Sequence, residues 1–344
     1  MTKGKILITG GTGYIGSHTV VELCNAGYEP IIIDNLSNSN IGVLEGIKSI
    51  VGHPVVYENI DCKDYSSLER FVEKHPDIVA IVHFAASKSV GESVTNPLLY
   101  YRNNLVSLIN LLQLMPKFSI KNIVFSSSCT VYGQPDVLPV TEQSPIKPAT
   151  SPYGSTKQMC ETILRDTTVA NPDLNVILLR YFNPIGAHPS AEIGELPNGI
   201  PNNLLPYITQ TAAGIRKELS VFGNDYDTKD GSCIRDYINV VDLAKAHVCA
   251  IERMIEGNNK ERVEVFNLGT GEGVSVLEII QTFEKATGVK LPYKIAPRRA
   301  GDIEKVWADT SYANKVLGWK AQESLEDTLR SAWNWQKKLM EKGK

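Results

Sequence analysis

The sequence has few cysteines, and none of the six stands at the spacing of a metal-binding or redox pair. They occur at positions 24, 62, 129, 160, 233 and 249. Without a Cys-x-x-Cys pair, the chain fits neither a zinc module nor a small disulfide-stapled domain. We therefore expect six reduced thiols and no metal site.

Long apolar runs are also missing. No stretch reaches the roughly 20 apolar residues that span a bilayer. The apolar run near the N-terminus, residues 5–9, is too short for a secretory signal. These absences predict a cytoplasmic protein without a membrane partner.

Neither sign of charge dominates. The sequence has 35 basic and 38 acidic residues, which gives a net charge of -3. The bulk charge therefore gives no reason to expect nucleic acid or an anionic membrane as a partner. Any phosphate group that the protein binds must be held by local groups, such as helix N-termini or single arginines.

Short β-rich runs alternate with helix-length segments through the first half of the sequence. Runs rich in Val, Ile, Phe or Tyr, typical of buried parallel strands, occupy residues 5–9, 30–34, 54–59, 78–84, 122–127 and 175–182. Helix-length segments occupy residues 14–25, 65–74, 97–115 and 152–170. This alternation predicts an α/β fold built on a Rossmann-type, doubly wound parallel sheet.

The alternation ends after residue 182, where proline becomes frequent. Prolines at positions 184, 189, 197, 201 and 206 stiffen a long connection, which is typical of a functional or interdomain segment. We therefore place a boundary at residue 183. A Rossmann domain is expected over residues 1–183, and a smaller mixed α/β domain over 184–344, with some of its segments packed back on the first.

A glycine-rich turn lies between the first predicted strand and the first predicted helix. Gly10, Gly13 and Gly16 allow backbone amides to approach a pyrophosphate at the positive end of a helix. Asp34, 18 residues after Gly16, stands where a carboxylate would accept hydrogen bonds from the adenosine ribose. No Arg or Lys occurs in residues 35–40, so NAD is favoured over NADP. The alternative is a glycine turn that binds nothing.

A Tyr-x-x-x-Lys sequence begins a later helix, with Ser151 as its expected N-cap and Pro152 in its first turn. Tyr153 and Lys157 share one helix face. A phenol with a pKa near 10 is a poor base, but a nearby ammonium and a cationic nicotinamide favour its phenolate. An ordinary amphipathic helix is the alternative.

Three serines end the fifth predicted strand, at the sheet edge where ligands of open α/β folds bind. A hydroxyl at that edge can bridge the tyrosine and a substrate oxygen. This segment resembles that of the short-chain dehydrogenase/reductase superfamily, and the resemblance implies that Ser128 has this role, whereas Ser126 and Ser127 serve backbone or cofactor contacts. Together with Tyr153 and Lys157, Ser128 predicts a hydride-transfer enzyme that acts on an alcohol or a carbonyl.

The spacing of the glycines resembles the extended branch of the short-chain dehydrogenase/reductase superfamily. Within it, segments along nearly the whole chain resemble the UDP-glucose (galactose) 4-epimerase family. These segments are residues 10–16, 34–39, 84–88, 100–104, 126–133, 180–183, 201–204, 222–226, 231–237, 298–302 and 307–309. Most are weak signals individually, but their order and density favour this family.

The resemblance implies a cofactor, NAD, and a set of residues that contact it. Besides the three catalytic residues, that set is Gly10, Gly13, Tyr14, Ile15, Gly16, Asp34, Asn35, Leu36, Ser37, Asn38, Ser39, Asp61, Cys62, Phe84, Ala85, Ala86, Ser87, Lys88, Asn103 and Phe182. Lys88 is taken as a second cation, although a solvated lysine is the ordinary alternative.

The resemblance also implies contacts with a UDP-sugar. They are Lys88, Ser128, Tyr153, Asn183, Asn203, Leu204, Ser220, Val221, Phe222, Arg235, Arg299, Asp302 and Val306. Ser220 to Phe222 would line the uracil pocket, and Asp302 would bind ribose hydroxyls. Arg235 and Arg299 are expected to neutralise the diphosphate, with surface ion pairing as the alternative.

The implied activity is an isomerase reaction of galactose metabolism, in which C4 of UDP-galactose or UDP-glucose is inverted through a transient 4-keto sugar. Related 4,6-dehydratases and decarboxylases carry acidic residues where this sequence has Cys129 and Thr130, so another nucleotide-sugar reaction is the less favoured alternative. A dinucleotide-sensing regulator would not need the Tyr-Lys pair. The resemblance also favours a homodimer, with the helices at 97–115 and 152–170 as its candidate interface.

One position departs from the commonest pattern of the family. The residue before the Trp-Ala-Asp segment is often a tyrosine that walls the sugar pocket, and here it is Val306. A smaller wall enlarges the pocket, so UDP-N-acetylgalactosamine and UDP-N-acetylglucosamine are expected as additional substrates.

Overall fold

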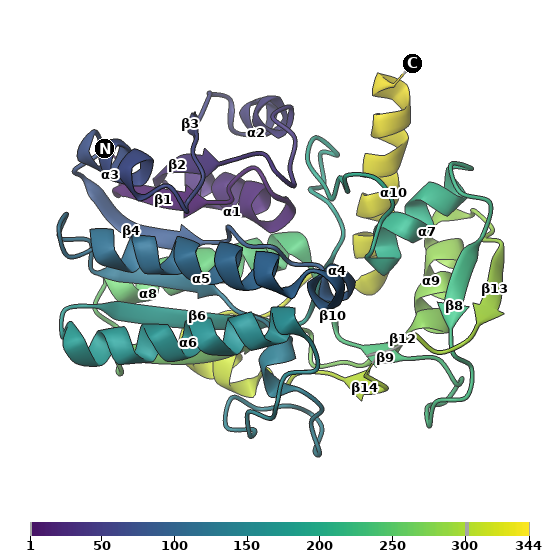
Figure 1. Cartoon of the computed structure of the whole chain (residues 1–344). Coiled ribbons are helices and arrows are strands. Elements are labelled where there is room, and N and C mark those ends of the chain that lie inside the picture. The colour runs from purple at the N-terminus through teal and green to yellow at the C-terminus, as the bar shows by residue number, and fades with distance from the viewer. Residues whose placement is uncertain (1, 300–302, 344) are drawn as a thin grey trace.

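A parallel sheet of seven strands forms the centre of the larger lobe in the computed structural model, which describes residues 2–299 and 303–343 (Figure 1). The strand order is β11-β6-β5-β4-β1-β2-β3. The bounds are Lys5–Thr9 for β1, Glu29–Asp34 for β2, Val56–Asn59 for β3, Ile78–His83 for β4, Asn122–Ser126 for β5, Asn175–Tyr181 for β6 and Val263–Leu268 for β11. This order confirms the predicted Rossmann-type, doubly wound sheet.

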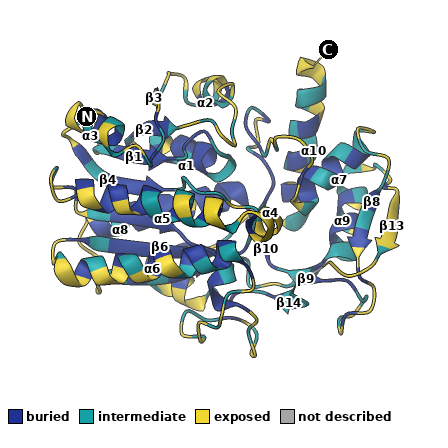
Figure 2. Ribbon diagram, viewed as in Figure 1, coloured by how far each residue is buried: buried dark blue, intermediate teal, exposed yellow. Residues whose placement is uncertain are grey.

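The strands are apolar on both faces because helices cover both faces. In β1, Ile6 and Ile8 point into one core cluster, and Leu7 between them points into the other. The first face is covered by α1 (Tyr14–Asn25), α2 (Val43–Val51) and α8 (Val240–Ile255); the second is covered by α3 (Tyr65–Glu73), α5 (Pro97–Leu114) and α6 (Pro152–Ala170). Figure 2 shows the sheet buried and the outward faces of α5 and α6 exposed.

The smaller lobe is built around a separate apolar cluster that includes Phe283 and Leu329. Its helices are α7 (Leu204–Ala212), α9 (Val276–Thr287) and α10 (Leu325–Lys342), beside the parallel pair of β8 (Leu219–Phe222) and β13 (Tyr293–Ala296). Short strands join the lobes: β7 (Asn183–Ile185) with β10 (Tyr237–Asn239), and β12 (Val274–Ser275) with β9 (Ile234–Arg235) and β14 (Lys305–Val306). The remaining elements are α4 (Val90–Thr95), η1 (Cys129–Tyr132) and η2 (Ala313–Leu317).

Each of the six predicted strands and four predicted helices is present, with ends within two residues of the expected ones. Ser151 caps α6 as predicted, since its side chain accepts a hydrogen bond from the Gly154 amide. The sequence analysis missed α2, and it did not place β11 in the sheet. Because β11 and α8 come from beyond residue 183, the later half of the chain completes the first lobe. Within the described residues, no helix is both long and apolar enough to cross a membrane.

Candidate active site

The sheet changes direction at β1, because the chain runs outward through β2 and β3 and then returns to place β4 on the other side of β1. The carboxyl ends of β1 and β4 therefore mark the switch point of the sheet, where ligands of open α/β folds bind. Gly10 begins the loop after β1 with a φ of 72°, and its amide donates to Ile33 O. A Cβ on Gly10 would lie 2.8 Å from Ala85 N, so only glycine permits the loops after β1 and β4 to approach so closely.

The start of α1 is shaped to receive an anion. Gly13 occupies the N-cap without a side-chain hydrogen bond, and the first turn contains no acidic residue. The helix also approaches the turn closely, because a Cβ on Gly16 would lie 2.3 Å from Gly10 O. The first-turn amides thus lack a side-chain acceptor and sit in a cradle that side chains would fill, as a dinucleotide pyrophosphate requires.

The Asp34 carboxylate organises the loop that follows β2. It accepts hydrogen bonds from the Leu36 amide at 2.9 Å, from Ser39 Oγ at 3.1 Å and from the Thr12 amide at 3.2 Å. The glycine turn and the 34–39 loop are thereby held together around one carboxylate. Asn35 extends this arrangement, because its Nδ2 donates to Asp61 Oδ2 at 3.1 Å.

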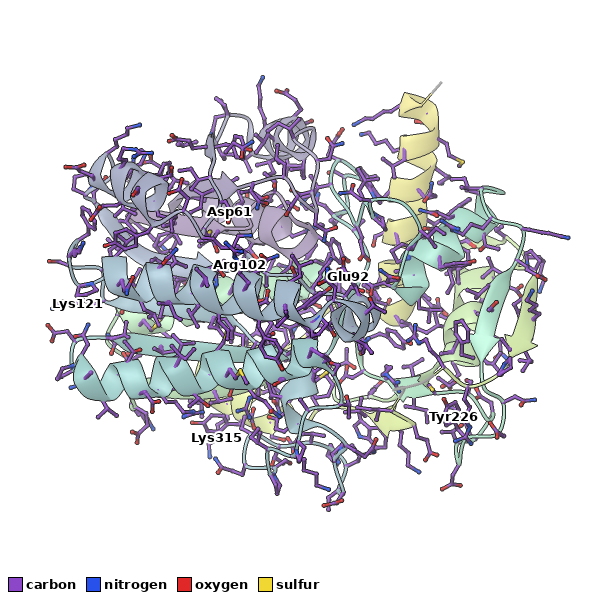
Figure 3. All side chains as sticks on the ribbon, in the orientation of Figure 1. Asp61, Glu92, Arg102, Lys121, Tyr226 and Lys315 are labelled. Carbon is purple, nitrogen blue, oxygen red and sulfur yellow. The ribbon has the colours of Figure 1, made fainter. Side chains whose placement is uncertain are left out.

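Lys63 connects several of the predicted cofactor residues, and the sequence analysis missed it. Its Nζ lies 3.4 Å from Asp61 Oδ2 and donates to Asn103 Oδ1 at 2.6 Å. Asn103 in turn donates to Ser87 Oγ at 3.0 Å. The structure therefore brings Asp61, Asn103 and Ser87 together, and Figure 3 shows Asp61 above α5, which carries Asn103. The available signal was the position of Lys63 directly after Asp61 and Cys62.

The predicted catalytic residues meet where β5 ends beside α6. Tyr153 and Lys157 are both buried. Lys157 Nζ donates to Ser126 O at 2.6 Å and lies 5.8 Å from the centroid of the Tyr153 ring. Ser128 is also buried, and its hydroxyl is near enough to the Tyr153 phenol to lower the pKa of that phenol. The three groups predicted from the sequence therefore lie together at the carboxyl edge of the sheet.

Burial drives the pKa values of the tyrosine and the lysine in opposite directions. Burial raises the pKa of the Tyr153 phenol well above 10, Tyr181 adds to the rise, and the Ser128 hydroxyl opposes it. Burial lowers the pKa of Lys157 from about 10.5 to about 8, against the opposing effects of Cys160 and Glu161. Each group is thus shifted toward its neutral form.

Thr130 is a second group at this edge that the sequence analysis missed. It lies two residues after Ser128, in the short helix η1. Its Oγ1 is buried and has no hydrogen-bond partner among residues 2–299 and 303–343. A buried hydroxyl without a partner is costly. This one is therefore a candidate to bind a ligand hydroxyl.

The smaller lobe supplies cationic and aromatic groups. Arg235 on β9 donates through Nη1 to Ile234 O at 2.8 Å, and the guanidinium carbon of Arg299 lies 5.6 Å from the centroid of the Phe222 ring. On β8, Val221 is buried in the core of this lobe, whereas Phe222 is 41% exposed. Asp302 lies outside the described residues.

Glu195 joins residues that were predicted from the two lobes, and the sequence analysis missed it too. Its Oε1 accepts a hydrogen bond from Asn203 Nδ2 at 2.6 Å and lies 3.9 Å from Lys88 Nζ. Asn203 is the N-cap of α7 and makes no side-chain cap there. The loop after β4 and the start of α7 are thus linked through one carboxylate, near α4, whose Glu92 lies between the lobes in Figure 3.

Val306 on β14 is buried in a small cluster at the junction of the lobes. The cluster includes Phe182, which directly follows β6, and Val131 and Tyr132 of η1, with Cys129 packed against it. Asn183 lies beside it, and its amide donates to Asp236 O at 2.9 Å. The structure therefore places Val306 close to the catalytic edge.

This arrangement defines a class: a Rossmann-fold enzyme of the extended short-chain dehydrogenase/reductase type, with a dinucleotide loop, a Ser-Tyr-Lys triad and a second, cation-bearing lobe. A family model described as GDP-mannose 4,6 dehydratase matches residues 7–332. A UDP-glucose 4-epimerase of Bacillus subtilis is 52% identical over 96% of this chain and 96% of its own length, and the human UDP-glucose 4-epimerase is 49% identical over 97% and 96%.

Solved structures agree with these relatives. The UDP-glucose 4-epimerase of Stenotrophomonas maltophila, with bound NAD and formylated UDP-arabinopyranose, has a TM-score of 0.95 and 47% identity, covering 98% of this chain and 99% of that chain. That of Bifidobacterium longum, in complex with NAD+ and UDP, has a TM-score of 0.92 and 50% identity, covering 97% and 98%. The chain therefore belongs to the family of that model and, within it, to the UDP-glucose 4-epimerases.

The lowered pKa of Lys157 predicts a pH-dependent stability. Between about pH 8 and 10.5 the unfolded chain binds a proton that the folded chain does not, so the free energy of unfolding rises with pH in that window. Relative to a Lys157→Met variant, the parent should gain about 2 kcal/mol between pH 7 and pH 9.5. Urea unfolding at both pH values measures this gain. A parent-to-variant difference that stays constant with pH would contradict the lowered pKa.

Proposed function

We propose that this chain catalyses the reversible epimerisation of UDP-galactose and UDP-glucose at C4, in galactose metabolism. The observation that carries the proposal is the meeting of Ser128, Tyr153 and Lys157 at the carboxyl edge, between the dinucleotide loop and the smaller lobe. The 4-epimerase relatives, near 50% identity over almost the whole chain, support the same reaction.

The cofactor is NAD, and the residues at the switch point fit it. The first-turn amides of α1 face the glycine turn, where the pyrophosphate would lie. Asp34 would accept hydrogen bonds from the ribose, and a 2′-phosphate would meet its like charge. Asp61 and Cys62 would lie near the adenine, and Phe84 to Lys88, Asn103 and Phe182 would make further contacts with the cofactor. When bound, NAD accepts a hydride from C4 of the sugar and returns it.

The UDP moiety is assigned to the smaller lobe. We propose that residues 1–183 hold mainly the cofactor and residues 184–344 mainly the sugar nucleotide. The start of α7 lacks a side-chain cap, so the Leu204 amide is a candidate contact for the diphosphate. Asn203, Arg235 and Arg299 are the side chains that we assign to the sugar nucleotide beside it. Ser220, Val221 and Phe222 would line the uracil pocket, with Asp302 at the ribose and Asn183 and Lys88 toward the sugar.

The chemical step needs one base and two supporting groups. Tyr153 takes the proton of the 4-hydroxyl as the 4-keto sugar forms, and Ser128 holds the same oxygen. Lys157, as an ammonium, favours the phenolate of Tyr153. Tyr153 then returns the proton after the ketose has presented its other face. Because the hexose must turn over, binding energy is better concentrated on UDP than on the sugar.

A dehydratase reaction is not supported by the residues at this edge. Elimination of water needs an acid and a base near C5 and C6, and the positions in question hold Cys129 and Thr130. Burial raises the pKa of the Cys129 thiol to about 12, so it is a poor base at neutral pH. The match to a dehydratase family model therefore reflects a shared fold and does not imply that this chain catalyses dehydration.

Purified protein should convert UDP-galactose into UDP-glucose without added NAD, because the cofactor is held through turnover. A coupled assay for UDP-glucose measures this conversion. A Tyr153→Phe variant should lose about 10²- to 10⁴-fold in kcat because it lacks the proton-accepting hydroxyl. Tyr28→Phe, a change at another buried tyrosine in the core of the first lobe, is the matched control and should keep its activity. Absence of UDP-glucose even after NAD is supplied would rule out the proposed function.

Val306 supports a wider substrate range. Valine leaves more room in the junction cluster than the tyrosine common in the family, so the pocket should admit a 2-acetamido group. We therefore include UDP-N-acetylgalactosamine and UDP-N-acetylglucosamine among the proposed substrates.

Replacement of Val306 by Tyr should remove the acetylated activity selectively, because the ring would fill the space that the acetamido group needs. We expect at least about a tenfold loss of kcat/KM for UDP-N-acetylgalactosamine and about a threefold change or less for UDP-galactose. Steady-state kinetics with both substrates measure the two losses, and the conservative variant Val306→Ile is the control. Equal losses on both substrates would contradict the proposed role of Val306 in admitting the acetamido group.

We also infer that the chain forms a homodimer through α5 and α6. These helices pack side by side (Figure 1), and Tyr101 OH donates to Ser155 Oγ between them at 3.3 Å. Apolar side chains on both helices remain exposed, notably Leu98 at 78%, with Leu99 and Met159. Such a patch favours association with a second copy. The six free thiols support a cytoplasmic location. The near-balanced charge gives no reason to propose a nucleic-acid or membrane partner.

Size-exclusion chromatography with light scattering should give twice the mass of one chain. A Leu98→Glu variant should shift the mass toward that of a monomer, because it places a charge in the apolar patch. Val137→Glu, a change at a similarly exposed valine that belongs to neither helix, is the control. A parent that elutes as a monomer at micromolar concentration would overturn the dimer.

A further inference from the structure

Two arginine–glutamate ion pairs with well-buried side chains occur in the part of the chain that the structure describes, and one lies beside the catalytic groups. Arg180 on β6 contacts Glu161 on α6 in a bidentate manner, with Nε 2.9 Å from Oε1 and Nη2 2.5 Å from Oε2. The two side chains are 4% and 7% exposed. Burying such a pair costs desolvation free energy. Apolar residues of similar volume at the same two positions often stabilise a fold equally or more.

The pair is connected directly to the segment that carries the catalytic serine. Ser127 is fully buried, and its Oγ donates to Glu161 Oε1 at 2.6 Å. Both neighbours of Ser127 belong to the candidate active site: Ser126 O accepts a hydrogen bond from the Lys157 ammonium, and the Ser128 hydroxyl lowers the pKa of Tyr153. Glu161 lies one helical turn after Lys157 on α6, so a single carboxylate ties the strand end to the helix that carries the base.

A second series of hydrogen bonds runs from the same ion pair to the backbone next to Val306. Arg180 Nη1 donates to Tyr132 OH at 3.0 Å, and that hydroxyl donates to Asn267 Oδ1 at 2.6 Å. Asn267 Nδ2 donates to Val140 O at 2.9 Å. The Val140 amide then donates to Trp307 O, next to Val306. The polar groups of the pair are thereby satisfied by partners on both sides of the site.

We propose that Glu161 is a positioning residue for the epimerase reaction: anchored by Arg180, it holds Ser127 and so fixes the serine segment against Tyr153 and Lys157. This inference rests on the proposed function. The geometric demand is severe, because a displacement of about 1 Å in a reacting group can cost 10²-fold in rate. Apolar residues at positions 161 and 180 would fill the space but would leave the Ser127 hydroxyl without its acceptor.

The second buried pair shows what a purely structural pair looks like in this fold. Arg253 and Glu264 also form a bidentate contact, with Nε 2.6 Å from Oε2 and Nη2 2.8 Å from Oε1. Their other partners are the backbone groups Val316 O and Lys260 N. None of these four residues is assigned to cofactor, substrate or catalysis. Glu264 is therefore a matched control for Glu161.

The test compares kcat with ligand affinity in Ser127→Ala, Glu161→Gln and Glu264→Gln. Ser127→Ala removes only the link between the pair and the serine segment, and we expect kcat to fall about tenfold or more. The dissociation constant of UDP, measured by calorimetric titration of the holoenzyme, should stay within about twofold of the parent, because binding and positioning are separate effects. Glu161→Gln should show the same split, and Glu264→Gln should keep the parent kcat even if its melting temperature falls.

These measurements test the positioning role of Glu161 separately from the proposed epimerase function. If the parent itself does not epimerise UDP-galactose, the function fails, whatever the variants do. If the parent is active and Ser127→Ala loses less than about fivefold in kcat, or loses UDP affinity in equal measure, the positioning role is overturned. It is also overturned if Glu264→Gln loses kcat as strongly as Ser127→Ala. Should Glu161→Gln fail to fold, the Ser127→Ala result decides alone.

Discussion

The constraint on which the site depends is the burial of the Lys157 ammonium at the carboxyl edge of the sheet. Its contact with Ser126 O replaces only part of its hydration, so its pKa falls to about 8. Burial also raises the pKa of Tyr153. Lys157 is thus held near the balance between its charged and neutral forms, whereas the Tyr153 phenol favours its neutral form and needs a neighbouring positive charge to become a phenolate. A surface-exposed pair would not respond to its neighbours in this way.

Phosphate binding in a chain of net charge -3 has to rest on local groups, and the helix starts show where they are. Most longer helices begin with a side-chain cap, as α6 does with Ser151 and α8 with Asn239. The starts of α1 and α7 lack one, and both lie where the loops of the two lobes meet. An uncapped start alone is not a site, since α2 lacks a cap as well. At α1 the added feature is the glycine cradle, which a side chain would fill.

The parts of the site that could be predicted from the sequence are those whose residues lie close together along the chain. A strand, a glycine turn and a helix are contiguous, and so are Tyr153 and Lys157 on one turn of α6. Three of the residues that were not predicted act through partners far along the chain: Lys63 through Asn103, Glu195 through Lys88, and Glu161 through Ser127. The pairing of β11 with β6 was missed for the same reason. No periodicity encodes such pairs, because their spacing is set by the tertiary fold.

The same dependence on distant partners explains how one scaffold supports different reactions. Returning a proton and a hydride to C4 needs only the triad, the cofactor and room for the ketose to turn. Elimination needs an additional acid and base, and the residues after Ser128 decide whether they are present. Here Cys129 packs against the cluster of Phe182 and Val306, and its buried thiol has a raised pKa. Cys129 therefore offers the 4-keto sugar no second base, which favours return of the hydride to either face of C4.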